Sequence, residues 1–574
     1  MLLSWLGLLP VLVLVFYPAL QAPFLLDDSG GIVGNAEFRS FSPHNLMMLF
    51  RNHGDNRAYD HHAVPGFVSM VDQALWGVDP FGYHLTNLAI HWVNCGLVLV
   101  LFLLILGHVA DTTRWQSLWI GVSLMAIWAV HPFSTMSVAY ITCRTESLMT
   151  LFYVLALIAF LAGWEWSTLP LGVMAILSKE VAVTLPGAIL MVDWARGGVG
   201  IVPTLLGRWR YYTGLTSVWL VMIAYHMRGG RRQSIGGDVM PLSSVSEYFK
   251  VECGIIASYF GKLVWPAKLQ FYPFYRPVTE WQQWVPQLVG ILVYIGIGFY
   301  LFRRWRWLAI AMLFPLLVLL PTSTFIPIPL EPAMEYRMYL PSAALLGLIV
   351  VGLWRWVSPM WARIALVCAA TLSLAVVSHL RSRDYESIVT LNEQQVSVDP
   401  RSLTGLEGLT GAYSSKGLID RAVATGEKML DYALADKNKE YAGRAFNLLG
   451  GIESDRKNYA AARDYFRRSY EMAGSGSAQM SLASMHVQLY ELKEADKILE
   501  QVLAMSPDHP NAMLLSFESK MSGKDYPAAE KILDRFLELY PDQRAELDVQ
   551  RTRLMHLKRK QADGAEPLTR PAPR

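Results

Sequence analysis

The chain has 574 residues and a formal net charge of +3; hydrophobic residues make up 53% of it, charged residues 17%, and 19 residues are Trp. A soluble protein of this length rarely combines such values, so the composition excludes an ordinary soluble enzyme and indicates a membrane protein. The two ends differ. Up to about Leu380 the sequence is a series of apolar runs, and beyond it the chain is charged, Ala-rich and helical in period.

Eleven apolar stretches are expected to cross a bilayer, which takes roughly 17–25 residues each. The first, within residues 1–21, lacks the basic start of a secretory signal, and we interpret it as a retained anchor. The segment near 246–265 is expected to lie on or dip into the outer face. The other ten lie near 90–109, 116–131, 147–163, 169–178, 181–193, 213–227, 284–302, 307–321, 338–354 and 361–379.

Basic residues in short loops predict the orientation, because cytoplasmic loops carry an excess of Lys and Arg. With eleven spans, three basic clusters fall on the side of the N-terminus, which is therefore predicted to be cytoplasmic. Arg228, Arg231 and Arg232 oppose this assignment. The three clusters are Arg196, Arg208 and Arg210, then Arg303, Arg304 and Arg306, then Arg355 and Arg363.

Charged and polar residues gather at the predicted outer face. Asp27 and Asp28 directly follow the first span, where a carboxylate drawn toward hydrocarbon costs about 3 kcal/mol; such charges mark binding or catalysis more often than packing. The alternative is a solvated helix end. The same face is predicted to carry His131, Arg144, Glu146, Lys179, Glu180 and Arg337. Together they could form a site for a charged lipid head group.

Metal binding is weakly supported by the sequence. His61 and His62 beside Asp60 form a cluster of ligand types, but adjacent residues rarely hold one ion, and a solvated loop is the favoured interpretation. The four cysteines have no framework spacing, so no structural disulfide is predicted. We predict no divalent metal, no other cofactor and no nucleic-acid partner.

The C-terminal region repeats with a period of 34 residues. Small residues recur at Ala461, Ala495 and Ala529, large ones four positions later at Tyr465, Leu499 and Leu533, and Pro507 and Pro541 keep the same step. This is the tetratricopeptide period, in which helical pairs stack into a solenoid that binds other proteins. With a degenerate pair near 402–435, about four pairs are expected. The tail 561–574 is predicted to be disordered.

Several motifs in the membrane part occur in a recognisable order. The run Asp79-Pro80-Phe81-Gly82-Tyr83-His84-Leu85-Thr86-Asn87-Leu88-Ala89-Ile90-His91 resembles the first-loop signature of the transmembrane and tetratricopeptide-repeat O-mannosyltransferases and their bacterial relatives. The ordered set also includes Asp27-Asp28, His131-Pro132 with Arg144 and Glu146, Ser178-Lys179-Glu180, and Glu335-Tyr336-Arg337-Met338-Tyr339. The chain departs from the family at Ala63 and Met136, which puts the sugar and acceptor in doubt more than the fold.

The resemblance implies an all-α protein. Residues 1–380 would form a polytopic C-type glycosyltransferase domain of about 11 helices, and 381–560 a periplasmic tetratricopeptide-repeat solenoid. Its expected partners are membrane lipid, a sugar donor on a polyprenyl phosphate and an acceptor protein recruited by the repeats. The compact loops favour a bacterial inner membrane. The expected chemistry is transfer of one sugar, mannose-like, to a protein hydroxyl at the outer face.

The residue types fit that reaction. A sugar on a lipid phosphate has a good leaving group, so one base suffices; Asp28 is our first choice and Asp27 the second. Arg337, Lys179 and Arg144 could balance the charge of the leaving phosphate. Further candidates in the motifs are Glu180, His131, Glu146, His84, Asn87 and Glu335. For each of these residues a purely structural role is the alternative to a role in the reaction. The structural role is favoured for His84 and His91, which share a helical face.

Two other functions remain open from the sequence. A non-enzymatic membrane scaffold could recruit envelope or pilus proteins through the repeats. A ligase could transfer a whole oligosaccharide from a polyprenyl diphosphate, which would call for a larger cavity and often a metal.

Overall fold

The computed structural model describes residues 1–50, 62–109, 112–197, 200–228, 245–276, 278–323 and 333–562. All regular elements in these ranges are helices, so the predicted all-α class is confirmed. Of the predicted disordered tail, residues 563–574 lie outside the described ranges. The chain divides into two compact units, one reaching Gly405 and one starting at Leu406.

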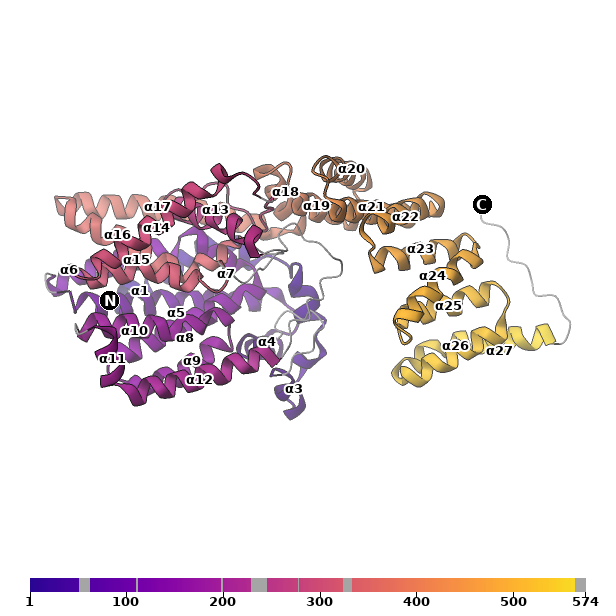
Figure 1. Ribbon diagram of the computed structural model, residues 1–574, viewed down its shortest axis with the longest axis horizontal. Coiled ribbons are helices and arrows are strands. Elements are labelled where there is room, and N and C mark those ends of the chain that lie inside the picture. The colour runs from indigo at the N-terminus through magenta and orange to yellow at the C-terminus, as the bar shows by residue number, and fades with distance from the viewer. Residues whose placement is uncertain are drawn as a thin grey trace. The chain divides into compact units, whose positions relative to one another are not determined.

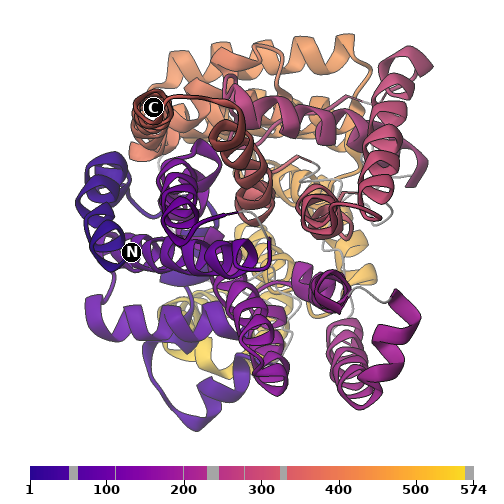
Figure 2. The ribbon, with the colours of Figure 1, turned by 90° about the vertical axis from the view of Figure 1, so that its left-hand side faces the viewer.

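The first unit is a bundle whose long helices run side by side (Figure 1). Figure 2, turned by 90°, shows these helices gathered around a common interior and not in a flat layer. The long helices are α2 (Leu8–Leu20), α5 (Pro80–Leu106), α6 (Arg114–Ala129), α8 (Arg144–Leu161), α10 (Leu185–Gly197), α12 (Trp209–Arg228), α13 (Val245–Val264), α14 (Val285–Leu301), α15 (Arg306–Leu319), α16 (Tyr339–Trp356) and α17 (Met360–Arg383). Shorter ones are α1 (Leu2–Leu6), α3 (Pro43–Met48), α4 (Ala63–Trp76), α7 (Thr135–Ala139), α9 (Thr168–Ile176), α11 (Ile201–Gly207) and α18 (Ile388–Val398).

All eleven predicted apolar stretches lie in helices, but not all are straight spans. By length and composition, five described segments could cross a membrane: Leu2–Leu20, Pro80–Leu106, Ile141–Leu161, Glu335–Trp356 and Met360–Glu386. Two bent pairs raise the number to seven, Arg114–Ala129 with Pro132–Ala139, bent by 54°, and Glu180–Gly197 with Ile201–Gly207. Helices α14 and α15 are apolar but shorter. Helices α12 and α13 are not among the candidate spans.

Local sequence signals explain where key helices begin. The side chain of Asp79 accepts a hydrogen bond from Phe81 N at 3.1 Å and Pro80 occupies the first turn, so α5 starts directly after the motif's aspartate. Thr113 and Gln116 form a reciprocal capping box at the start of α6. The cap at Asp79 thus fixes the start of the helix that carries the predicted site residues His84 and Asn87.

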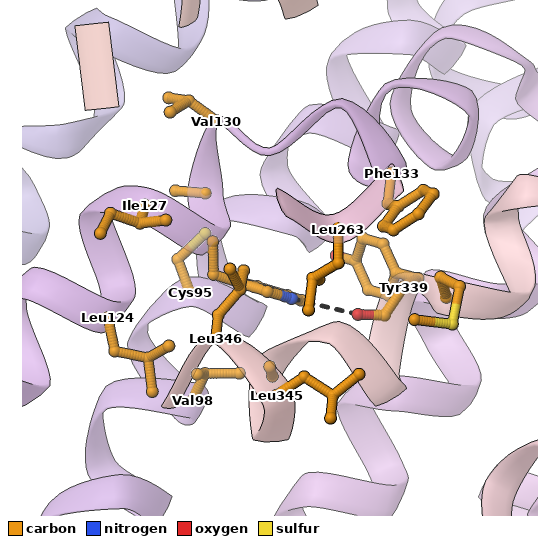
Figure 3. Close-up of a cluster of buried hydrophobic side chains, with 14 of the residues drawn as sticks. Cys95, Val98, Leu124, Ile127, Val130, Phe133, Leu263, Tyr339, Leu345 and Leu346 are labelled. Atoms are coloured by element: carbon orange, nitrogen blue, oxygen red, sulfur yellow. Dashed lines mark hydrogen bonds between the residues drawn. The ribbon is translucent and has the colours of Figure 1, made fainter. Parts of the chain in front are cut away.

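The largest apolar core joins α2, α5, α6, α13 and α16. Figure 3 shows side chains from the last four of these helices. Polar side chains inside it are bonded. Nδ1 of His91 lies 2.7 Å from the Tyr339 hydroxyl, and Trp128 Nε1 donates to Tyr339 O at 3.1 Å. Buried polar groups with such partners specify how helices register against one another.

Helix α1 is held against α5 by two tryptophans that bond reciprocally. Trp5 Nε1 donates to Trp92 O at 2.9 Å and Trp92 Nε1 donates to Trp5 O at 3.0 Å. Their rings stack with centroids 4.1 Å apart. Gly96 makes this approach possible, because a Cβ there would lie 2.8 Å from Trp5 Nε1.

A smaller apolar cluster closes one end of the bundle. It joins the end of the first span to the 136–143 turn, the residues before α16 and the segment after α17; its members include Ala19, Leu25, Met136, Tyr140, Cys143, Phe271, Met334, Tyr336, Tyr385 and Leu391. The segment after α17 is also bonded there, since Gln394 donates to Leu269 O at 2.7 Å. Residues 381–405 therefore pack with the first unit, although the sequence assigned them to the repeats.

The second unit is a series of helical pairs. With α19 (Leu403–Ser415), whose first residues belong to the first unit, the pairs are α19 with α20 (Ile419–Ala435), α21 (Lys439–Asp455) with α22 (Tyr459–Ala473), α23 (Gly476–Gln488) with α24 (Leu492–Met505), and α25 (Pro510–Ser522) with α26 (Tyr526–Leu539). Helix α27 (Arg544–Ala562) follows. The four predicted pairs are all present.

The predicted 34-residue register is wrong by one position in one repeat. Ala495 and Ala529 are fully buried as expected, but their counterpart in α22 is Ala462 and not Ala461. Phe466 likewise fills the groove that was assigned to Tyr465. The step from Ala462 to Ala495 is one residue shorter than the next, and so is the step between the left-handed turn residues Lys457 and Tyr490, compared with Tyr490 to Lys524.

Candidate functional site

The two adjacent aspartates of the first loop face different surroundings. The Asp28 side chain is 1% exposed; its carboxylate accepts hydrogen bonds from Thr142 N at 2.9 Å, from the Thr142 hydroxyl and from Leu25 N at 3.1 Å. Burial raises the pKa of Asp28 to about 6, although these bonds oppose the rise. Asp27 is exposed, and its backbone N donates to the Tyr140 hydroxyl at 3.3 Å.

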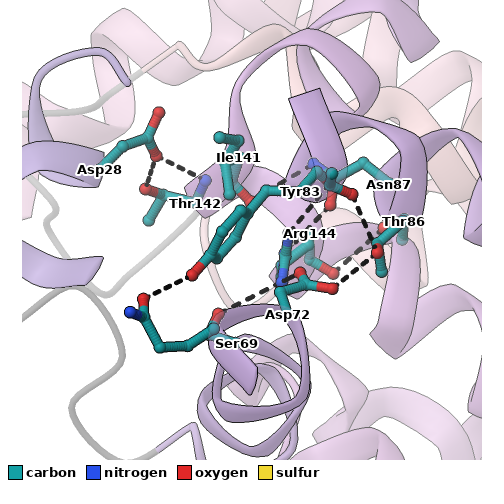
Figure 4. Close-up of polar contacts among 12 residues, drawn as sticks. Asp28, Ser69, Asp72, Tyr83, Thr86, Asn87, Ile141, Thr142 and Arg144 are labelled. Atoms are coloured by element: carbon teal, nitrogen blue, oxygen red, sulfur yellow. Dashed lines mark hydrogen bonds and ion pairs between the residues drawn. The ribbon is translucent and has the colours of Figure 1, made fainter. Parts of the chain in front are cut away.

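Arg144 is the centre of a buried polar network (Figure 4). Its Nη1 lies 2.6 Å from Asp72 Oδ2 and 3.2 Å from Ser69 Oγ. Nε donates to Asn87 Oδ1 at 3.0 Å, and Nη2 to Tyr83 O at 3.2 Å. A guanidinium with no exposed surface and four protein acceptors has no open side for a phosphate. The geometry therefore favours a structural role for Arg144 over the predicted donor contact.

Lys179 is held between a carboxylate and an aromatic ring. Its Nζ lies 2.6 Å from Glu146 Oε2 and 4.0 Å from the centroid of the Tyr336 ring. Lys179 keeps 12% of its side-chain surface exposed, whereas Glu146 keeps 1%. Burial lowers the pKa of Lys179, but Glu146 and Glu180 offset this, so the pKa is raised overall and the side chain is a cation at neutral pH.

The neighbouring Glu180 has its own partner in the first loop. Its Oε2 lies 2.9 Å from His62 Nε2. His62 is thus used in a polar contact with a carboxylate, while Asp60 and His61 lie outside the described residues. In the described ranges, no three His, Cys, Asp or Glu side chains come together as a metal site would require.

Glu335 and Arg337 follow each other in the same turn but make unrelated contacts. Glu335 is fully paired: Oε2 lies 2.6 Å from Arg381 Nη2, and Oε1 lies 3.1 Å from Lys262 Nζ and 3.0 Å from Gln270 N. This carboxylate joins α13, α17 and the start of α16. Removing either Arg381 or Lys262 would leave the buried charge of Glu335 less well balanced.

Arg337 lies on the other side of this turn. Its Nη1 donates to Thr322 O at 3.0 Å and lies 3.8 Å from Glu252 Oε1. The residue between the two, Tyr336, is the one whose ring contacts Lys179. The contact between Tyr336 and Lys179 therefore brings together the segments that carry the predicted donor cations Arg337 and Lys179.

The histidines and Asn87 serve structural contacts, as favoured from the sequence for the histidines of α5. Nε2 of His84 lies 3.1 Å from Ala22 O, and Nε2 of His131 lies 3.0 Å from Leu263 O. His131 also accepts from Phe133 N at 3.2 Å and so caps the short turn after it. Besides its bond with Arg144, Asn87 Nδ2 donates to Ile141 O at 3.4 Å.

Sequence reasoning missed the partners of these residues. Asp72, Thr142, Glu252, Lys262 and Arg381 supply the contacts just described, and each is distant in sequence from its partner. A signal existed for Asp72, since it is the single charged residue of α4. Thr142 carries no such signal.

The fold and these contacts define a polytopic helical membrane protein with a tetratricopeptide unit. A tetratricopeptide repeat family model matches residues 486–548. Over 208 residues the chain is 24% identical to protein O-mannosyl-transferase TMTC4 of Mus musculus, covering 32% of this chain and 28% of the relative. It is 29% identical over 194 residues to protein O-mannosyl-transferase F38B6.6 of Caenorhabditis elegans, covering 32% and 27%.

The resemblance predicted from the motifs is confirmed by these relatives. A third, protein O-mannosyl-transferase Tmtc1 of Drosophila melanogaster, is 28% identical over 186 residues, covering 30% of this chain and 20% of the relative. The alignments thus span less than a third of each relative named here. What they support for this chain is a similarity to protein O-mannosyl-transferases within part of its length.

Proposed function

We propose that this chain is a membrane protein glycosyltransferase of the C-type fold, which moves one sugar from a polyprenyl phosphate to a hydroxyl of an acceptor protein. The observation that carries the proposal is the difference in environment between Asp27 and Asp28. Asp28 is fixed by Thr142 and Leu25, and this leaves Asp27 exposed at the end of the bundle where Tyr336 and Lys179 also lie. The mannosyl-transferase relatives support the reaction class.

The reaction is a single displacement. The acceptor oxygen attacks the anomeric carbon, the bond from that carbon to the phosphate oxygen breaks, and the phosphate leaves with the electron pair. Asp27 takes the acceptor proton. Because attack and departure occur on opposite faces of the sugar, the configuration inverts. A positioned base of this kind contributes roughly 10²–10⁴-fold to the rate.

This assigns the two aspartates in the reverse order to the sequence ranking. The sequence ranks Asp28 first as the base, but its carboxylate is buried and accepts three hydrogen bonds. An acceptor hydroxyl would have to displace these bonds. Asp27 is exposed and needs no such rearrangement. Asp28 then acts as a positioning residue, which holds the loop against Thr142.

The leaving phosphate requires cations. Arg337 and Lys179 supply them in this proposal, one as a planar fork and one as a point charge. The repeat unit selects the acceptor protein, and the site faces the periplasm of a bacterial inner membrane, with the N-terminus in the cytoplasm. No metal takes part in the proposed displacement.

Comparative mass spectrometry of envelope proteins tests the reaction class. A strain lacking the gene is complemented with the wild-type chain or with Asp27→Asn, and the surface variant Asp420→Asn serves as the matched control. We expect a single hexose to disappear from particular Ser or Thr residues and to return only with wild type and control. Loss of a whole oligosaccharide would identify a ligase. An assembly defect without any glycan change, rescued equally by Asp27→Asn, would identify a scaffold.

A further inference from the structure

Glu252 on α13 is a buried carboxylate that the described protein leaves unsatisfied. It is 1% exposed, and neither of its carboxylate oxygens has a hydrogen bond of good geometry from the described residues, although the hydroxyls of Tyr248 and Ser323 lie close to it. Tyr248, one turn earlier, directs its hydroxyl proton to Thr322 O at 2.6 Å. The hydroxyl of Ser323, which lies near Glu252, is also buried and forms no hydrogen bond of good geometry with the described residues. Leaving such groups unbonded in a buried site is energetically unfavourable, and more so for a charge.

The contrast with Glu335 makes this unusual within one end of the bundle. Glu335 is just as buried, but it has two cations and a backbone N–H. Among the described residues Glu252 has one cation nearby, and Nη1 of Arg337 lies 3.8 Å from its Oε1, which is beyond hydrogen-bond distance. The same Nη1 is bonded to Thr322 O. Two buried glutamates thus flank one short turn, and one of them has its bonding capacity unused.

An anion bound beside Glu252 would favour the protonated form of its carboxyl group. A phosphate bound to Arg337 would lie close to Glu252, and two negative charges in a buried site repel each other strongly. A protonated Glu252 removes the repulsion and gains an O–H donor. Its surroundings already favour that form, because burial raises the pKa of Glu252 to about 7 in spite of Arg337.

We propose that Glu252 binds the donor phosphate as a neutral acid, by donating a hydrogen bond to a phosphate oxygen beside Arg337. This rests on the proposed function, in which Arg337 holds that phosphate. The Ser323 hydroxyl is placed to donate a second bond. Glu252 is therefore a specificity residue, which favours a ligand with bare phosphate oxygens.

The proposal predicts that donor binding takes up one proton. The described groups that face Glu252 are Arg337 and, on its own helix, Tyr248, Cys253 and Tyr259, with Tyr275 beyond. The pKa values of the tyrosines and the cysteine are raised above their ordinary values, so none of them titrates between pH 6 and pH 8. Donor affinity should be highest below pH 7 and fall by up to about tenfold per pH unit above it.

The test is donor binding to the full chain in detergent micelles between pH 6 and pH 8.5. The probe is polyprenyl phosphoryl mannose, a phosphodiester whose single charge does not titrate in this range. Wild type should lose affinity as the pH rises. Glu252→Gln keeps a neutral hydrogen-bond donor, so its affinity should be independent of pH and close to the wild-type value at pH 6. Glu252→Ala should bind at least tenfold more weakly at pH 6.

Controls separate this inference from the proposed function. Glu280→Gln, an exposed carboxylate change, should keep the wild-type pH profile. If Arg337→Gln binds the probe as wild type does, the phosphate is held elsewhere and that part of the proposed function fails. If Arg337→Gln loses the probe while Glu252→Gln titrates like wild type, Glu252 is no phosphate ligand although Arg337 is. If Glu252→Gln and Glu252→Ala behave alike at pH 6, the hydrogen bond does not exist.

Discussion

Arg144 and Asp72 form an ion pair of 2.6 Å in which both side chains are closed off from solvent. The pair ties α4 to the start of α8, and Arg144 extends the tie to α5 through Asn87. Burying two charges is costly, and the attraction between them offsets the cost only while both are present. Their role is therefore to hold the helices next to the 141–143 turn, which in turn holds Asp28.

The first prediction concerns this pair. Asp72→Asn or Arg144→Gln alone should destabilise the protein by about 3–5 kcal/mol, because one charge stays buried without its partner. Replacing both, as Asp72→Leu with Arg144→Met, should cost less than either single change. The measurement is thermal unfolding in detergent, with the exposed Arg303→Gln as control. Equal melting temperatures for all variants would show that the pair carries no stabilisation.

The second prediction concerns catalysis. Asp27→Asn cannot accept a proton at neutral pH and should reduce sugar transfer by about 10²–10⁴-fold, with donor binding unchanged. Asp28→Asn should fold and lose less activity than Asp27→Asn, because Asp28 only positions the loop. Some loss is expected, since the new amide nitrogen would face a backbone N–H donor and loosen the loop. Transfer is measured with purified protein and labelled donor. Wild-type rates in Asp27→Asn, with loss confined to Asp28→Asn, would return the base to Asp28.

The third prediction concerns pH and stability. The folded state raises the pKa of Asp28 from 3.8 to about 6, so between these values the folded protein binds more protons than the unfolded chain. Stability from this group is then greatest below about pH 4, falls as the pH rises toward 6, and is level above it. Asp28→Asn should remove this component. Unfolding of wild type and Asp28→Asn is compared from pH 4 to pH 7, and parallel curves would contradict the expected difference.

The fourth prediction concerns the donor. Arg337→Gln and Lys179→Gln should each raise the KM for lipid donor at least tenfold, since each removes a cation that balances the phosphate. Arg144→Gln should act on stability and leave the KM of the folded fraction unchanged. Initial rates are measured at several donor concentrations. If neither KM moves, both residues are interface and packing groups.

The fifth prediction concerns orientation. A reporter that is active only outside the cytoplasm should work when fused after Lys560 and fail when fused after Arg208, and a cytoplasm-only reporter should give the opposite pattern. Identical results at both sites would mean that the number of crossings between them is even. Helix α13 would then be the first segment to re-examine, because the predicted count excludes it.

The helices and repeats could be predicted because their signals are local. Apolar length, the caps at Asp79 and Thr113, and a fixed repeat period act within a few turns of chain. The 54° bend at His131 was not predictable, because it depends on a partner elsewhere in the fold. The shift from Ala461 to Ala462 shows the same limit, since one residue fewer in a repeat leaves the helical pattern intact.

For the site, the sequence identified residue types and their common end of the bundle, but not their partners. Arg144 has the charge that a phosphate needs, yet Asp72 and Asn87 already occupy it. Glu252 shows the opposite case. Glu252 belongs to none of the sequence motifs, and its distinguishing feature, a buried carboxylate without a well-formed hydrogen bond from the described residues, is visible only in the structure.

The paired indoles of Trp5 and Trp92 have a consequence for biogenesis. They join α1, which leads into α2, to α5, and the chain segment between α2 and α5 carries Asp27 and Asp28. Both tryptophans emerge from the ribosome before Thr142 does. We expect the contact between Trp5 and Trp92 to form during insertion, before Thr142 is synthesised. The segment that carries the aspartates is then already constrained when Asp28 meets Thr142, which lowers the entropy cost of forming that contact.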